Sequence, residues 1–181
     1  ADLAGVLAFL AARAVPGIEE VTHQTYRRSL VLPHGVGIVE LTPADGFLDA
    51  ALRLADPRDL ASAVARCRRL FDLDADIAAV DEVLAADPAL APLISAAPGR
   101  RVPGAVDGDE LAVRSVLGQQ VSVAAARNLA GRMVLAYGKP LDSPLGAVTH
   151  AFPTAAALAA VDPAEFPLPG RRQNTLHELV T

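Results

Sequence analysis

The sequence predicts an α+β protein made of two units: an antiparallel sheet with helices over residues 1–75, and an all-helical unit over residues 76–181. The first observation is the alternation of apolar and polar residues in the first unit, broken by turns, which is typical of short antiparallel strands. The second is the change, after residue 56, to alanine-rich segments with helix N-cap signals. The third is a hydrophobic content of 52%, which is enough for a packed core.

The first unit opens with a helix that leads into strands. Apolar residues at helical spacing predict a helix over residues 3–14, which Pro16-Gly17 ends. Its apolar stripe contains Leu3, Val6, Leu7, Leu10 and Ala14. Three alternating stretches follow, separated by turns that contain proline and glycine. These stretches are residues 25–32, 36–41 and 48–54. We therefore expect a three-stranded antiparallel meander.

The remaining elements are predicted to be helices. A helix opens at Asp56-Pro57, and its buried face is expected to carry Leu60, Val64, Cys67 and Phe71. Asp107 with Glu110 resembles a capping box, in which the acidic side chain bonds back to the cap residue. Three further residues are N-cap candidates, two of them followed by proline. They are Asp87, Thr154 and Asp162.

Composition excludes several classes of protein. The single Cys67 excludes a disulfide framework and a cysteine-rich metal cluster. No run approaches the roughly 18 apolar residues that a membrane helix needs, so we expect no membrane partner. The net charge of −5 argues weakly against nucleic acid, but the arginines are bunched. The bunches are Arg66, Arg68 and Arg69; Arg100 and Arg101; Arg171 and Arg172. Such bunches are more often solvated helix faces than binding sites.

Residues 107–138 contain the most informative segment. We interpret them as two helices joined at Gly118-Gln119-Gln120-Val121, with Ser122 capping the second helix and Gly118 permitting the sharp turn. Two adjacent glutamines at an exposed tip offer hydrogen-bonding groups that packing does not require. The alternative is that both are ordinary solvent-facing loop residues.

The stretch VLGQQVSV resembles the signature of the helix-hairpin-helix base-excision glycosylases, and further segments resemble the bacterial AlkA family of DNA-3-methyladenine glycosylases. These segments occur in order along nearly the whole chain. They are FLAARAV at 9–15, YRRSL at 26–30, RLFDLDAD at 69–76, RVPGAVDGDE at 101–110 and FPTAAALAAVDP at 152–163. The resemblance implies a TATA-binding-protein-like N-terminal domain followed by a helical glycosylase domain, and an enzyme that flips and hydrolytically releases alkylated bases from double-stranded DNA.

The resemblance also implies which residues meet DNA. The loop residues Gly118, Gln119, Gln120 and Val121 match the family loop that enters the minor groove and fills the space left by the extruded base. Some family members have leucine at the position of Gln120, so an amide replaces an apolar wedge here. Phe9 and Arg13 match residues that border the base pocket. Their alternative is an ordinary domain-interface phenylalanine and a solvated arginine.

The family's hairpin and catalytic aspartate lie downstream of Thr181, so we expect no catalytic residue within this chain and no base release by it alone. Apolar side chains such as Leu129, Met133, Leu176 and Val180 are then expected to lack packing partners. The resemblance implies no cofactor and no metal, and a cytoplasmic, nucleoid-associated monomer. His177-Glu178 begins like HExxH, but residue 181 is threonine, so that zinc motif fails. The alternative function is a non-catalytic DNA-binding or regulatory module, such as part of an Ada–AlkA fusion regulator.

Overall fold

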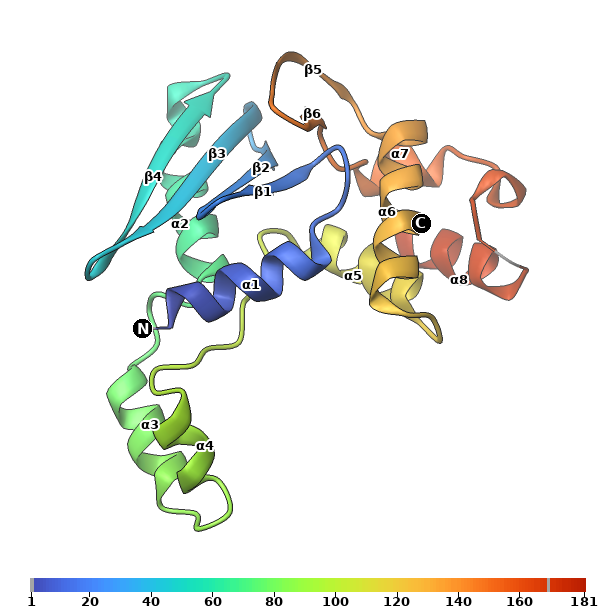
Figure 1. The fold of residues 1–181 in the computed structure, drawn as a ribbon. Coiled ribbons are helices and arrows are strands. Elements are labelled where there is room, and N and C mark those ends of the chain that lie inside the picture. Colours follow the sequence, from blue (N-terminus) through green and yellow to red (C-terminus); the bar gives the residue numbers. More distant parts are fainter. Residues whose placement is uncertain (1, 169) are drawn as a thin grey trace.

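The computed structural model describes residues 2–168 and 170–181, and it divides into a sheet unit and a helical unit (Figure 1). In the first unit, α1 (Leu3–Arg13) precedes an antiparallel sheet in the order β1-β2-β3-β4. The strands are β1 (Glu19–Thr22), β2 (Thr25–Leu32), β3 (Gly35–Ala44) and β4 (Phe47–Leu54). The short 3₁₀ helix η1 (Pro57–Asp59) then leads into α2 (Leu60–Leu70).

The meander has four strands, one more than the alternation predicts. The additional strand β1 has only four residues, and two of them are Glu19 and Glu20. Of the two positions on its inward face, Glu19 is a buried charge and only Val21 is apolar, so the alternation by which a half-buried strand is recognised is missing. Strand β1 pairs with β2 over its full length, from Glu19 opposite Arg28 to Thr22 opposite Thr25.

A first hydrophobic core lies between the sheet and helices α1 and α2. The predicted stripe of α1 is confirmed at Val6, Leu7 and Leu10, which are buried. The predicted face of α2 is wrong at Leu60 and Val64, which are 51% and 41% exposed. The buried α2 residues are Ala63, Cys67 and Leu70. The spacing of Ala63, Cys67 and Leu70 makes one helical face that packs on the strands, and Leu60 and Val64 lie beside this face toward solvent.

Helices α3 (Ile77–Ala85) and α4 (Ala91–Ala96) form a hairpin that projects from the rest of the molecule (Figure 1). None of the described residues of these two helices is buried. Val83 and Leu93 are 72% and 65% exposed. Asp87 accepts a hydrogen bond from the Ala89 amide in the turn between the helices, so it caps a turn rather than α4.

The helical unit contains α5 (Gly108–Gly118), α6 (Val123–Tyr137), α7 (Ala155–Ala159), the short η2 (Pro163–Glu165) and α8 (Arg171–Val180). Its core includes Leu117, Met133 and Leu176, which are fully buried, and Leu129, which is 9% exposed. The expectation that Leu129, Met133, Leu176 and Val180 lack packing partners is therefore wrong, since Val180 also packs against this core. Thr154 and Asp162 cap α7 and η2, as predicted.

The second unit is not all-helical, because a hairpin of β5 (Pro140–Leu145) and β6 (Val148–His150) follows α6. Gly146 turns the hairpin with a φ of +60°, a conformation that glycine adopts without steric cost. The Thr149 amide bonds the carbonyl of Gly17 at 2.8 Å, so the hairpin is tied to the segment after α1. The domain boundary near residue 75 stays a prediction. Within the described residues, no helix is both long and apolar enough to cross a membrane.

Candidate nucleic-acid interface

The loop between α5 and α6 is a tight turn with both glutamines at its tip. Gln119 has φ −64° and ψ 128°, and Gln120 has φ +57°, which is the pattern of a type II turn. The side chains of Gln119 and Gln120 are exposed, whereas Gly118 and Val121 are half-buried. The Ser122 hydroxyl accepts the Ala125 amide at 3.2 Å, so Ser122 caps α6 as predicted.

The residue that makes the sharp turn is Gln120 and not Gly118. Gly118 is the last residue of α5, and an added Cβ there would meet only the Ala126 methyl at 4.0 Å. The left-handed region at Gln120 instead favours glycine or asparagine, because a side chain crowds the backbone there. The turn therefore keeps a long polar side chain at a position where its backbone is strained.

Replacing Gln120 with glycine is expected to raise the free energy of unfolding by about 0.5–1 kcal/mol. The left-handed conformation costs roughly 1–2 kcal/mol for a residue with a Cβ, and the greater freedom of glycine in the unfolded chain offsets about 0.5–1 kcal/mol of that relief. Urea unfolding measures the change. The matched control is Gln119→Gly, which should lower stability because Gln119 has an ordinary φ of −64°. A loss of stability in both variants would contradict the assigned strain.

A cleft of about 200 Å³ lies beside this loop. The structure brings Arg13, Gly118 and Val121 to its wall together with Arg114 and Arg127, but not the side chains of Gln119 and Gln120. Among the described residues that line it, none carries a carboxylate. The cleft is bordered by cationic side chains and by the N-terminal turn of α6, whose helix dipole adds further positive potential.

Phe9 and Arg13 lie one helical turn apart on α1, as predicted. The Arg13 guanidinium carbon lies 3.7 Å from the centre of the Phe9 ring, which is a cation–π contact. Phe9 is 40% exposed. Phe9 lines a neighbouring cleft that shares Arg13 and Arg114 with the first one. The Arg13 guanidinium therefore covers one face of the Phe9 ring.

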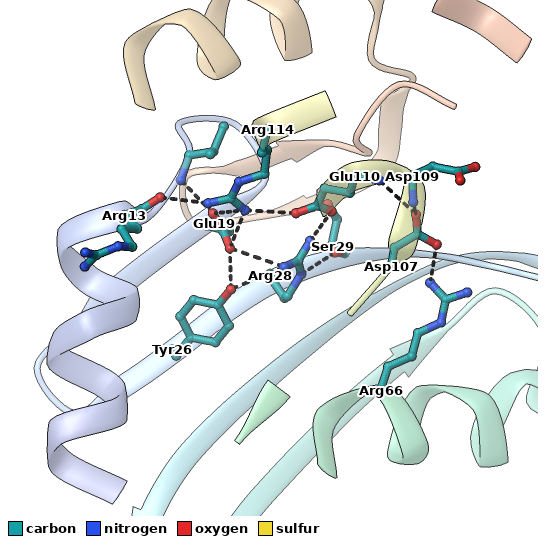
Figure 2. A network of polar contacts seen from close by, with 11 residues as sticks. Arg13, Glu19, Tyr26, Arg28, Ser29, Arg66, Asp107, Asp109, Glu110 and Arg114 are labelled. Carbon is teal, nitrogen blue, oxygen red and sulfur yellow. Dashed lines mark hydrogen bonds and ion pairs between the residues drawn. The ribbon is translucent and has the colours of Figure 1, made fainter. Parts of the chain in front are cut away.

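A network of charges, whose residues also line the Phe9 cleft, joins α1, the sheet and α5 (Figure 2). Arg28 on β2 contacts Glu19 at 3.2 Å and Glu110 at 2.6 Å. Arg114 contacts Glu110 at 2.9 Å and donates to the carbonyl of Arg13 at 3.0 Å. The network thereby fixes the end of α1, which carries Arg13, against α5, which leads into the loop.

The network keeps the Glu19 carboxylate charged. Burial acts to raise the pKa of Glu19, but the guanidinium groups of Arg114 and Arg28 outweigh it and hold that pKa below its ordinary value. The Tyr26 hydroxyl donates to Glu19 at 2.5 Å, and burial raises the pKa of Tyr26 well above its ordinary value. Burial likewise raises the pKa of the Cys67 thiol to about 11, which leaves this cysteine protonated and unreactive.

The capping-box prediction is half wrong. Asp107 accepts hydrogen bonds from the amides of Asp109 and Glu110, as an N-cap should. The Glu110 side chain does not return to Asp107 but belongs to the buried network. The spacing of Glu110 and Arg114, four residues apart on one helix, was the available sequence signal for this pair.

Most of the bunched arginines form ion pairs or hydrogen bonds within the protein. Arg66 pairs with Asp107 at 3.3 Å, and Arg68 pairs with Asp74. Arg101 donates to the carbonyl of Asp72. Arg172 donates to a carbonyl of the α5–α6 loop. In the described part of the chain, no group of three or more histidine, cysteine or acidic side chains is placed to hold a metal ion.

Comparison with known proteins places these features in a family. A family profile described as "AlkA N-terminal domain" matches residues 1–107. A Mycobacterium tuberculosis protein named "Probable bifunctional transcriptional activator/DNA repair enzyme AlkA" is 53% identical over 176 residues, which cover 97% of this chain and 36% of that protein. The Escherichia coli K12 protein named "DNA-3-methyladenine glycosylase 2" is 40% identical over 164 residues, covering 90% of this chain and 55% of that protein.

Solved structures share the fold at low sequence identity. The 3-methyladenine DNA-glycosylase from Archaeoglobus fulgidus superposes with a TM-score of 0.84 at 17% identity, covering 99% of this chain and 62% of that one. The Clostridium acetobutylicum 8-oxoguanine glycosylase/lyase bound to DNA superposes with a TM-score of 0.62 at 16% identity, over 91% of this chain and 64% of that one. The chain spans about a third to a half of the length of the two curated relatives. From the profile match over more than half of its residues, the chain belongs to the AlkA N-terminal domain family.

Proposed function

We propose that this chain is part of a DNA glycosylase that removes alkylated bases such as 3-methyladenine, and that its loop Gly118–Val121 enters double-stranded DNA. The observation that carries the proposal is the strained, exposed Gln120 at the tip of the turn between α5 and α6. Strain of this kind persists only where the surrounding structure holds it in place, and it clusters at functional sites. The printed name of the Escherichia coli relative supports the substrate class.

Base excision requires a side chain that fills the space left by the extruded base, and the loop can supply one. An enzyme that acts on a base inside a duplex must extrude the nucleotide into a pocket, at a cost of about a few kcal/mol. A side chain inserted into the base stack keeps the duplex open and bent. Glutamine is long enough to enter the stack, and its amide can both donate to and accept from base edges. Gln119 and Gln120 are therefore proposed to occupy the space left by the extruded base.

The pocket side of the proposal rests on Phe9 and Arg13. An N-alkylated purine carries positive charge, so an aromatic face attracts it by cation–π interaction. The Arg13 guanidinium occupies the Phe9 ring in the structure, and a cationic base that reaches this ring must displace it. The proposed partner is double-stranded DNA containing alkylated bases, bound by a monomeric cytoplasmic protein associated with the nucleoid.

The chain is expected to bind a duplex with an abasic-site analogue more tightly than an undamaged duplex of the same sequence, and to release no 3-methyladenine. Cleavage of a glycosidic bond passes through an oxocarbenium-like state that a carboxylate stabilises. The described residues that line the cleft beside the loop supply none. The Phe9 cleft is lined by three carboxylates, but each is held in an ion pair with arginine. They are Glu19, Asp107 and Glu110. Anisotropy titrations at matched salt measure the affinity for the two duplexes, and an assay for free base measures the release of 3-methyladenine. Equal affinity for both duplexes, or base release above the rate without protein, would contradict the proposal.

A second candidate is a DNA-binding module of a regulator without catalysis of its own. The observation that favours it is the printed name of the Mycobacterium tuberculosis relative, which joins a transcriptional activator to a repair enzyme, together with the 36% of that protein that the chain covers. A regulatory module should prefer one DNA sequence. Part of a glycosylase should instead prefer the abasic site in any sequence. Titrations with two unrelated sequences separate the candidates.

A further inference from the structure

Helix α8 reaches the glutamine loop through one side chain. The Nη1 atom of Arg172 donates to the carbonyl oxygen of Gln119 at 2.9 Å. The same atom lies 3.4 Å from the carbonyl oxygen of Leu117. Arg172 is in the first turn of α8, more than fifty residues from the loop in sequence, and it is half-buried. Its contact is made to the backbone of the loop and leaves the two glutamine side chains free.

The carbonyl of Gln119 decides which turn the loop adopts. Type I and type II turns differ chiefly in the orientation of the peptide that joins their two central residues, here Gln119 and Gln120. The type I orientation would give Gln120 a negative φ, which suits any residue with a Cβ. The observed orientation gives Gln120 a φ of +57° and points the Gln119 carbonyl at Arg172. A charged hydrogen bond to this carbonyl therefore opposes the flip that Gln120 would otherwise favour.

The contact with Leu117 acts in the same direction. The last carbonyls of a helix lack partners within the helix, and a cation near them is favourable. Leu117 is in the final turn of α5, so one guanidinium nitrogen serves both the end of the helix and the centre of the turn.

We propose that Arg172 is the positioning residue of the loop Gly118–Val121: its guanidinium locks the peptide between Gln119 and Gln120, and so presents the Gln120 side chain at the tip. The role in DNA rests on the proposed function, whereas the lock itself is a property of the free protein. The residue touches neither a base nor the reacting atoms in this account, and it acts only through the backbone that carries Gln120.

The test compares Arg172→Met with Arg171→Met in the 181-residue chain. Both variants lose one positive charge from the same turn of α8, and Arg171 is exposed. The three-bond HN–Hα coupling of Gln120 reports its φ, and amide exchange of residues 119–122 reports the order of the loop. We expect Arg172→Met to change the coupling, to accelerate exchange at least tenfold, and to weaken binding to the abasic-site duplex three- to tenfold relative to Arg171→Met. Arg172→Lys, which can serve one carbonyl, should recover part of each change.

The outcomes separate the lock from the DNA-binding proposal. If coupling and exchange are the same in Arg172→Met and Arg171→Met, the lock is overturned whatever happens to DNA binding. If coupling and exchange change while Gln120→Ala binds the abasic-site duplex like the wild type, the lock is supported and the proposed function of the loop fails. If both respond, the lock and the function stand together.

Discussion

Replacing Arg28 with methionine is expected to lower the free energy of unfolding by about 3–5 kcal/mol, the usual cost of removing one partner from a buried ion pair. The side chains of Arg28 and Glu19 are both only 3% exposed, and that of Glu110 is 8% exposed. Methionine preserves the length of the stem but leaves the two carboxylates with Arg114 as their remaining cation. Two buried carboxylates that share one guanidinium are poorly compensated in a low-dielectric interior.

The matched control is Arg27→Met, on the same strand and with the same change of charge. Arg27 points to the other face of the sheet, where it pairs with Glu20 and Glu40 at partly solvated positions. Pairs of this kind contribute about 1 kcal/mol or less. Urea unfolding of both variants measures the difference, and Arg28→Lys provides a charge-preserving variant if Arg28→Met does not fold. Equal losses for Arg27→Met and Arg28→Met would contradict the large stability cost assigned to breaking the buried network.

Replacing Gln120 with alanine is expected to weaken binding to a duplex with an abasic site by about 1–3 kcal/mol, the usual scale for losing one specific contact to bases. Alanine keeps the Cβ and therefore the strain of the turn, so the melting temperature should not change. Gln119→Ala should behave similarly. The control is Gln24→Ala, the same substitution at an exposed residue in the turn between β1 and β2. If Gln24→Ala loses as much affinity for the abasic-site duplex as Gln120→Ala does, the effect at Gln120 is not specific to the loop.

The spacing of hydrophobic residues and the residue types at turns and caps were sufficient to predict the long, regular elements of the fold. The stripe of α1, three strands of the sheet and the caps Thr154, Asp162 and Ser122 are confirmed. Strand β1 and the β5–β6 hairpin were not predicted because their segments are short, charged or rich in proline. They form strands because they pair with other segments of the chain. Their ladder partners are not visible in a local window of sequence.

The exposure of the loop was predictable from the sequence, but its backbone geometry was not. The exposed Gln119-Gln120 pair was identified from the lack of any packing role, and both side chains are exposed. The assignment of the turn to Gly118 was wrong, because the long-range contact from Arg172 favours the left-handed conformation at Gln120. The buried network was missed for the same reason, since Arg28 and Glu110 are 82 residues apart.

The most direct test of the account is whether the loop enters the base stack. A duplex carries 2-aminopurine, an adenine analogue whose fluorescence is quenched while it is stacked, beside a central abasic site. We expect the wild-type chain, at saturating concentration, to change this fluorescence as the Gln120 side chain displaces the neighbouring base. Gln120→Gly, which keeps the turn but has no side chain, should bind without that change. The same fluorescence change with wild type and Gln120→Gly, both fully bound, would contradict the claim that Gln120 fills the gap.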